Sequence, residues 1–221
     1  MKHSTTSNRS EKTLQTTTPR WTGGSFLELV QAFNNRYLET LTRAARRGEV
    51  QTLPAIPRRH QCMWTSLDRR ALRRASLCPL ILADFKFRDV AWWRSAANAE
   101  PPGNRDVDGE PIPRIGDMEV ARDALTVAWL TAREDICLAT LLIGMPGEIA
   151  ELVARFALHD LWQLADRHHH CLRPRYEHRG AFWSRLLSAA ARDDRKTLHD
   201  LHRHAFLLAD AECGPGTSAH R

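Results

Sequence analysis

Apolar residues recur at helical spacing through most of the chain. An early example follows Gly24: Ser25 is placed to cap free backbone amides, and Glu28 lies where a capping box needs its carboxylate. Apolar positions then recur three or four residues apart until Gly48, a residue that commonly follows the last turn of a helix. The pattern predicts a helix whose apolar stripe contains Phe26, Leu29, Val30, Phe33, Tyr37 and Leu41.

A longer helical pattern begins at Asp117 and runs to about Ile143. Its apolar residues alternate in steps of four and three, the heptad spacing with which one helix packs along another. The partner helix lies either in the same chain or in a second copy, and the pattern alone leaves both open. The residues of this seam are Leu125, Trp129, Ala132, Ile136, Ala139 and Ile143.

Shorter patterns complete a predicted all-α fold. In the first half, a helix is expected over 66–76, followed by an apolar stretch in which 80–82 could form a short strand. In the second half, Gly144 ends the long helix and Pro146 opens the next one. Further helices are expected over 158–167, 180–191 and 194–211, with a polar bend at 168–178.

Proline and glycine are concentrated in residues 100–116, too densely for a regular element. We interpret this segment as a linker between two regions. The predicted organisation is a disordered tail, a basic and mostly helical N-terminal region, the linker, a helical C-terminal domain and a second disordered tail, at 1–24, 25–99, 100–116, 117–211 and 212–221.

Charge distinguishes the two halves. The whole chain has a formal net charge of +6, but residues 1–100 hold 17 Lys and Arg against 8 Asp and Glu, which leaves the remainder acidic. The basic half is the better candidate for nucleic-acid contact. Within it, four arginines at positions i, i+1, i+4 and i+5 share one helix face and could bind phosphate oxygens, or simply face solvent. They are Arg69, Arg70, Arg73 and Arg74.

Neither a membrane span nor an enzyme is predicted. No apolar run approaches the roughly 18–20 residues that a span needs, and the polar N-terminus lacks the apolar core of a secretory signal, so we expect a cytoplasmic protein. No glycine-rich phosphate loop, GxSxG or HExxH motif occurs. Paired carboxylates are adjacent along predicted helices, where their side chains diverge instead of converging on a substrate.

Histidine and cysteine are plentiful, but their spacing does not predict a metal site or other cofactor. The five cysteines form no CxxC pair, and nine of the eleven histidines follow residue 150. The densest group is His168, His169 and His170, directly before Cys171. Three consecutive residues cannot all face one ion, so we interpret the group as a solvated turn.

The long helix, the Gly-hydrophobic turn after it and the next helix together form a distinctive pattern over roughly residues 118–210. The residues of this pattern are Leu125, Trp129, Leu130, Ala132, Arg133, Ala139, Thr140, Leu141, Leu142, Ile143, Gly144, Met145, Glu148, Ile149, Ala150, Leu152, Ala154, Leu158, Leu161, Leu164, Ala165 and Cys171. The pattern resembles that of the D subunit of the bacterial flagellar master transcription activator.

The resemblance implies an all-helical domain that dimerises through intertwined long helices and assembles with a zinc-containing subunit that makes most of the DNA contacts. The resemblance also implies that the seam from Leu125 to Ile143 forms the dimer interface. Cys171 would then lie near its twin in that interface, because the family can form an inter-subunit disulfide near this position. We therefore expect a transcriptional co-regulator of motility, secretion or another regulon. The alternative is an interaction or scaffold protein of a secretion or mobile-element system, with Trp92 and Trp93 as a docking surface.

Overall fold

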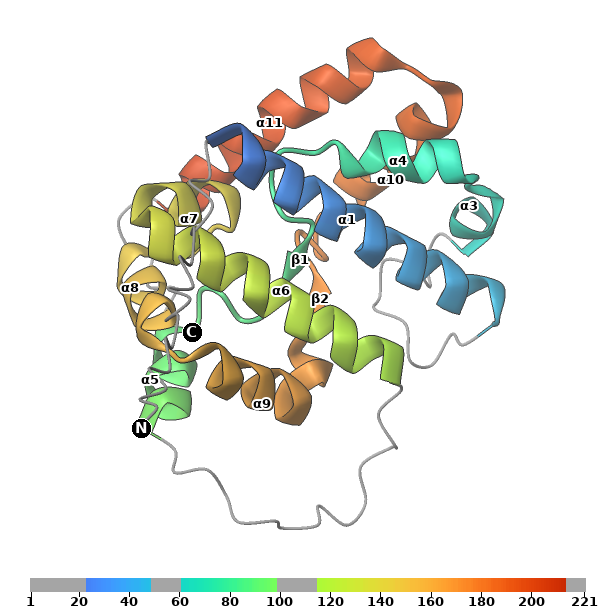
Figure 1. The fold of residues 1–221 in the computed structure, drawn as a ribbon. Coiled ribbons are helices and arrows are strands. Elements are labelled where there is room, and N and C mark those ends of the chain that lie inside the picture. Colours follow the sequence, from blue (N-terminus) through green and yellow to red (C-terminus); the bar gives the residue numbers. More distant parts are fainter. Residues whose placement is uncertain (1–22, 49–60, 99–114, 214–221) are drawn as a thin grey trace, which may run out of the picture.

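The structure is a computed structural model that describes residues 23–48, 61–98 and 115–213. It confirms the all-α class: helices form about three quarters of the described chain, and its strands form one short ribbon (Figure 1). Most of the predicted linker and both predicted tails, apart from their inner ends, lie outside the described residues. The elements are α1 (Gly23–Arg46), α3 (Gln61–Ser66), α4 (Arg69–Ser76), β1 (Ala83–Asp84), α5 (Val90–Asn98), α6 (Ile115–Glu134), α7 (Ile136–Leu142), α8 (Gly147–Arg155), α9 (Leu158–His168), the 3-10 turn η1 (His169–Cys171), β2 (Arg173–Pro174), α10 (Gly180–Arg192) and α11 (Arg195–Cys213).

The long helix predicted over 117–143 is wrong in one respect, because the chain breaks it at Asp135. This residue is extended, with φ −155° and ψ 117°, and its side chain accepts hydrogen bonds from the amides of Cys137 and Leu138. Aspartate is a strong N-cap, so it ends α6 and begins α7. The helix predicted over 66–76 is also divided, since Asp68 caps α4 and separates it from α3.

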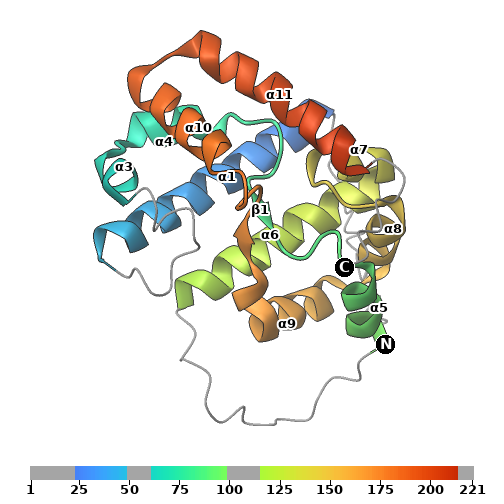
Figure 2. The same ribbon diagram turned by 180° about the vertical axis from the view of Figure 1, so that it is seen from behind.

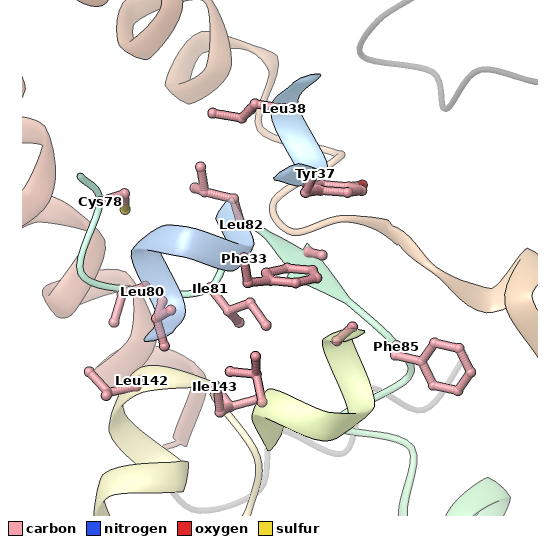
Figure 3. Packing of buried hydrophobic residues seen from close by; sticks show 14 of the residues in the cluster. Phe33, Tyr37, Leu38, Cys78, Leu80, Ile81, Leu82, Phe85, Leu142 and Ile143 are labelled. Carbon is pink, nitrogen blue, oxygen red and sulfur yellow. The ribbon is translucent and has the colours of Figure 1, made fainter. Parts of the chain in front are cut away.

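A single buried core joins the two regions that the sequence divides at 100–116. Helix α1 packs on α6, and α4 packs on α10. Helices from before the predicted linker therefore pack directly on helices that follow it. Figure 3 shows Phe33 and Tyr37 of α1, Leu80–Leu82, and Leu142 and Ile143 after α6 gathered in this core. The two regions are therefore not separate domains.

The strand predicted at 80–82 forms slightly later, as β1, and its partner is β2 from the other half of the chain. The ribbon is antiparallel: Ala83 pairs with Pro174, and Asp84 pairs with Arg173. The first residue of each strand thus faces the second residue of the other. This register is compatible with a local two-fold axis between the strands, as it is in any antiparallel pair of equal length. The ribbon lies near the centre of the molecule, close to the place where α1 and α6 pack on each other (Figures 1 and 2).

The chain around the ribbon repeats the same geometry in both halves. Shortly after each strand one residue adopts a left-handed backbone, Lys86 with φ 52° and Tyr176 with φ 59°. Each half then places a buried tryptophan that donates its indole N–H to a backbone oxygen after the strand: Trp93 to Lys86 at 2.9 Å and Trp183 to Arg175 at 2.8 Å. The helices follow the same order, since α1 packs on α3 and α4 while α6 packs on α8 and α9.

We expect Trp93→Phe and Trp183→Phe to destabilise the protein by similar amounts, because each removes the same kind of indole hydrogen bond from an equally buried site. The loss in the free energy of unfolding should be about 2–3 kcal/mol for each, from the orphaned carbonyl and the lost ring volume. Urea denaturation measures both. Trp162→Phe is the control, since that side chain is 40% exposed. Values that differ by more than about 1.5 kcal/mol would argue against equivalent halves.

No single helix among the described residues has the length and hydropathy of a membrane span. Helices α7 and α8 pass that test only when taken together, and they are bent by 116° relative to each other.

Candidate functional site

Helix α4 carries the arginines that the sequence singles out. Asp68 starts the helix by accepting a hydrogen bond from the amide of Ala71 at 2.6 Å. Ala71, Leu72 and Ala75 are buried on the side that faces α1 and α10. The opposite side of the helix is exposed and carries Arg69, Arg70 and Arg73.

Three of the four arginines lie together on the exposed face of α4, and the fourth points elsewhere. Arg69, Arg70 and Arg73 are exposed, and no other described residue forms an ion pair with them. Arg74 points the other way: its Nε donates to the carbonyl of Ala190 at 2.7 Å. It therefore binds the last turn of α10 and cannot belong to a phosphate-binding strip, which corrects the four-residue prediction.

A groove between α1 and α4 lies beside the three remaining arginines. Its volume is about 570 Å³. The α1 side contributes Glu28 and Glu39, so the groove is not uniformly basic. The complete lining is Glu28, Gln31, Ala32, Asn35, Glu39, Arg69, Arg70, Arg73, Ser76 and Leu77. Sequence reasoning missed the α1 residues, because nothing in their local pattern indicates that α4 packs beside them.

The predicted dimer seam lies inside the chain. Leu125, Ala132, Ala139 and Ile143 are each at most 2% exposed. Trp129 is partly buried, and its indole N–H donates to the carbonyl of Phe156 at 2.9 Å. Ile136 also packs against the same core. Of the two alternatives left open by the heptad spacing, the structure shows packing within the same chain.

Cys171 is also buried, with 9% of its surface exposed. Burial raises the pKa of its thiol, while the charges of Lys86 and Arg173 act in the opposite direction. A thiol that resists ionisation reacts slowly in disulfide exchange. An inter-subunit disulfide at this position would require the segment to open first.

The turn that carries the family resemblance is closely packed. Gly144 has φ 81°, and its amide donates to the carbonyls of Ala139 and Thr140 at 3.2 and 3.1 Å. The guanidinium of Arg175 lies against it and contacts the carbonyl of Leu142 at 3.4 Å. Arg175 itself is 6% exposed and follows β2, so the turn is fixed to the central ribbon.

Comparison with known proteins gives no match to a family model, a curated protein or a solved structure.

Proposed function

We propose that this chain is a non-enzymatic transcriptional co-regulator that acts with a DNA-binding partner subunit. Within that complex, Arg69, Arg70 and Arg73 would contact DNA phosphates. The observation that carries the proposal is the outward face of α4, where these three guanidinium groups are exposed and none pairs with a described carboxylate. Arginine in this state can bind phosphate oxygens without first breaking an internal ion pair.

The repeated halves support the same proposal. The resemblance implies a domain that dimerises through long helices, and here α1 and α6 pack on each other within one chain. The two-fold register of β1 and β2 lies beside this pair. We therefore propose that one chain occupies the place that the resemblance gives to two subunits. A partner that recognises a two-fold arrangement would meet both halves on a single molecule.

We expect the triple variant Arg69→Glu, Arg70→Glu, Arg73→Glu to weaken DNA binding by the complex at least tenfold, a loss of about 1.4 kcal/mol. Each phosphate contact contributes about 0.9 to the slope of log affinity against log salt, so the slope should fall by about 2–3. The complex would be purified from native cytosol through a tag on this chain. Its binding to sheared genomic DNA would then be measured at several salt concentrations.

The matched control is Arg133→Glu, Arg155→Glu, Arg167→Glu, which reverses three exposed charges on α6, α8 and α9. We expect this control to retain most of the affinity and slope. Recovery of a cysteine-rich DNA-binding subunit with the tagged chain, partly lost after nuclease treatment, would support the proposal. An unchanged slope in the α4 variant would contradict it.

A second candidate function is that of an interaction or scaffold protein without a DNA role. The docking surface predicted from Trp92 and Trp93 does not support it, because Trp93 is fully buried and Trp92 packs edge-on against it. The α1–α4 groove supports this second function, because its lining combines Glu28 and Glu39 with the arginines. The lining also includes Leu77, an apolar side chain that is 47% exposed. A partner retained at high salt and after nuclease treatment would favour this function.

A further inference from the structure

The histidine-rich turn differs from the sequence-based interpretation. His169 turns back, and its Nδ1 lies 3.0 Å from the carbonyl oxygen of Asp166 at the end of α9. The tight η1 turn brings His168 and His170, the neighbours of His169, close to Cys171. The ligand atoms of His168, His170 and Cys171 all lie within 4.8 Å of one another. Of the three consecutive histidines, His169 points away, and the other two come together with Cys171.

We propose that His168, His170 and Cys171 form a Zn²⁺ site with two imidazole ligands and one thiolate. This donor set suits zinc, which binds histidine nitrogen at about 2.0–2.1 Å and cysteine sulfur at about 2.3 Å. In a tetrahedral site, neighbouring ligand atoms are then about 3.3–3.7 Å apart. Side-chain rotations that bring the ligand atoms closer by about 1 Å therefore complete the geometry. Three protein ligands leave a fourth position for water or for a side chain of a partner.

The surroundings of the cluster favour a fixed site over a loose surface group. Cys171 is buried at the base, and His168 packs edge-on against the ring of Trp92 with 5.4 Å between ring centroids. His170 is the exposed member, so its ring has room to rotate towards the other two. Both signs of charge act on the thiol, since Lys86 and Arg173 lower its pKa while Asp84 and Asp89 raise it.

The corresponding connection in the other half of the fold, which the structure describes throughout, has no such cluster. There, the segment that leads from α4 to β1 contains Cys78, Leu80 and Ile81, all of which are fully buried. That segment is apolar and offers no imidazole. The connection from α9 to β2 carries histidines at the corresponding place. Within the described residues, the cluster is therefore present in one of the two similar halves and absent from the other.

The test is a titration of the full-length, chelator-treated protein with Co²⁺, which replaces Zn²⁺ and reports its ligands by absorption. We expect one equivalent to give the bands of a tetrahedral ion together with a thiolate-to-cobalt charge-transfer band, and Zn²⁺ to displace both. Wild-type protein should also gain thermal stability when Zn²⁺ is added, because an ion that binds only the folded state stabilises it.

Two matched pairs of variants identify the site. His170→Ala should weaken binding by more than the roughly 10- to 100-fold that loss of an outer-shell partner costs, while His169→Ala should bind as wild type does. Cys171→Ser should lose the charge-transfer band, and Cys137→Ser, which removes an exposed thiol elsewhere, should keep it. Because His170 is exposed, its variant tests the site without disturbing the core. Equal weakening by His169→Ala and His170→Ala would indicate adventitious binding to surface histidines and overturn the proposal, as would a charge-transfer band that persists in Cys171→Ser.

Discussion

Asn34→Ala should lower the free energy of unfolding by about 4 kcal/mol or more, because it orphans three buried backbone groups at once. Asn34 is fully buried in α1. Its side-chain amide donates to the carbonyls of Cys78 and Leu80 at 3.1 and 2.9 Å, and its oxygen accepts from the amide of Leu82 at 2.8 Å. The side chain thus replaces the partner strand that this segment lacks just before β1. Since domains are stable by only about 5–15 kcal/mol, the variant should be close to unfolding.

The neighbouring residue supplies the control. Asn35 is only partly buried, and its amide bonds to Glu39 one turn away in the same helix. Asn35→Ala should therefore cost less than about 1 kcal/mol. Urea denaturation followed by circular dichroism compares the two variants. If Asn34→Ala lay within about 1 kcal/mol of wild type, the proposed role of this side chain in holding 78–82 against α1 would be wrong.

Gly144→Ala is the second substitution from which we expect a large effect. A β-carbon at this position would lie 2.2 Å from Nη2 of Arg175, and that side chain has little room to move because it is buried. The positive φ alone costs an alanine about 1–2 kcal/mol. Displacing the guanidinium adds about 1–3 kcal/mol, since its contact with the carbonyl of Leu142 is lost. We expect a total of about 3–5 kcal/mol.

Gly48→Ala separates these two contributions. Gly48 has φ 70°, close to that of Gly144, but nothing lies within 4 Å of its would-be β-carbon. It should show only the backbone cost of about 1–2 kcal/mol. The shift in denaturation midpoint at constant slope measures both variants. Equal losses for the two glycines would mean that Arg175 yields freely, and that the turn is less tightly fixed to the ribbon than its packing indicates.

Local patterns in the sequence predicted most of the longer helices, but not the short helices α3 and α5. They also failed where distant segments decide the outcome. The stripe of α1 and the stop at Gly48 follow from spacing and from glycine geometry, both of which are local. The break at Asp135 was missed because heptad spacing continues through it, although aspartate is a common cap. The location of the seam could not be read from its own residues, since a buried face packs equally well against the same chain or a second copy.

The repeat and the site residues were harder to predict for different reasons. The segment from Asp84 to Trp93 and that from Pro174 to Trp183 differ in nearly every side chain, so their likeness lies in backbone conformation and in the final tryptophan. For the arginines, helical spacing indicated a shared face but placed Arg74 on it. Its Nε instead binds Ala190, more than a hundred residues away in sequence. The cluster of His168, His170 and Cys171 could not be predicted from spacing. No sequence signature indicates the η1 turn, which points His169 away from the other two histidines.

The equivalence of β1 and β2 has a genetic consequence. In a homodimer, every substitution appears twice, once in each subunit, so the two faces of the assembly must change together. In this chain the halves are covalently joined and separately encoded, and each can change alone. Helix α4 presents arginines, while α9, which packs on α6 as α4 packs on α1, presents Asp160, Trp162 and Gln163 to solvent. One face can thus acquire a ligand while the other keeps the fold intact.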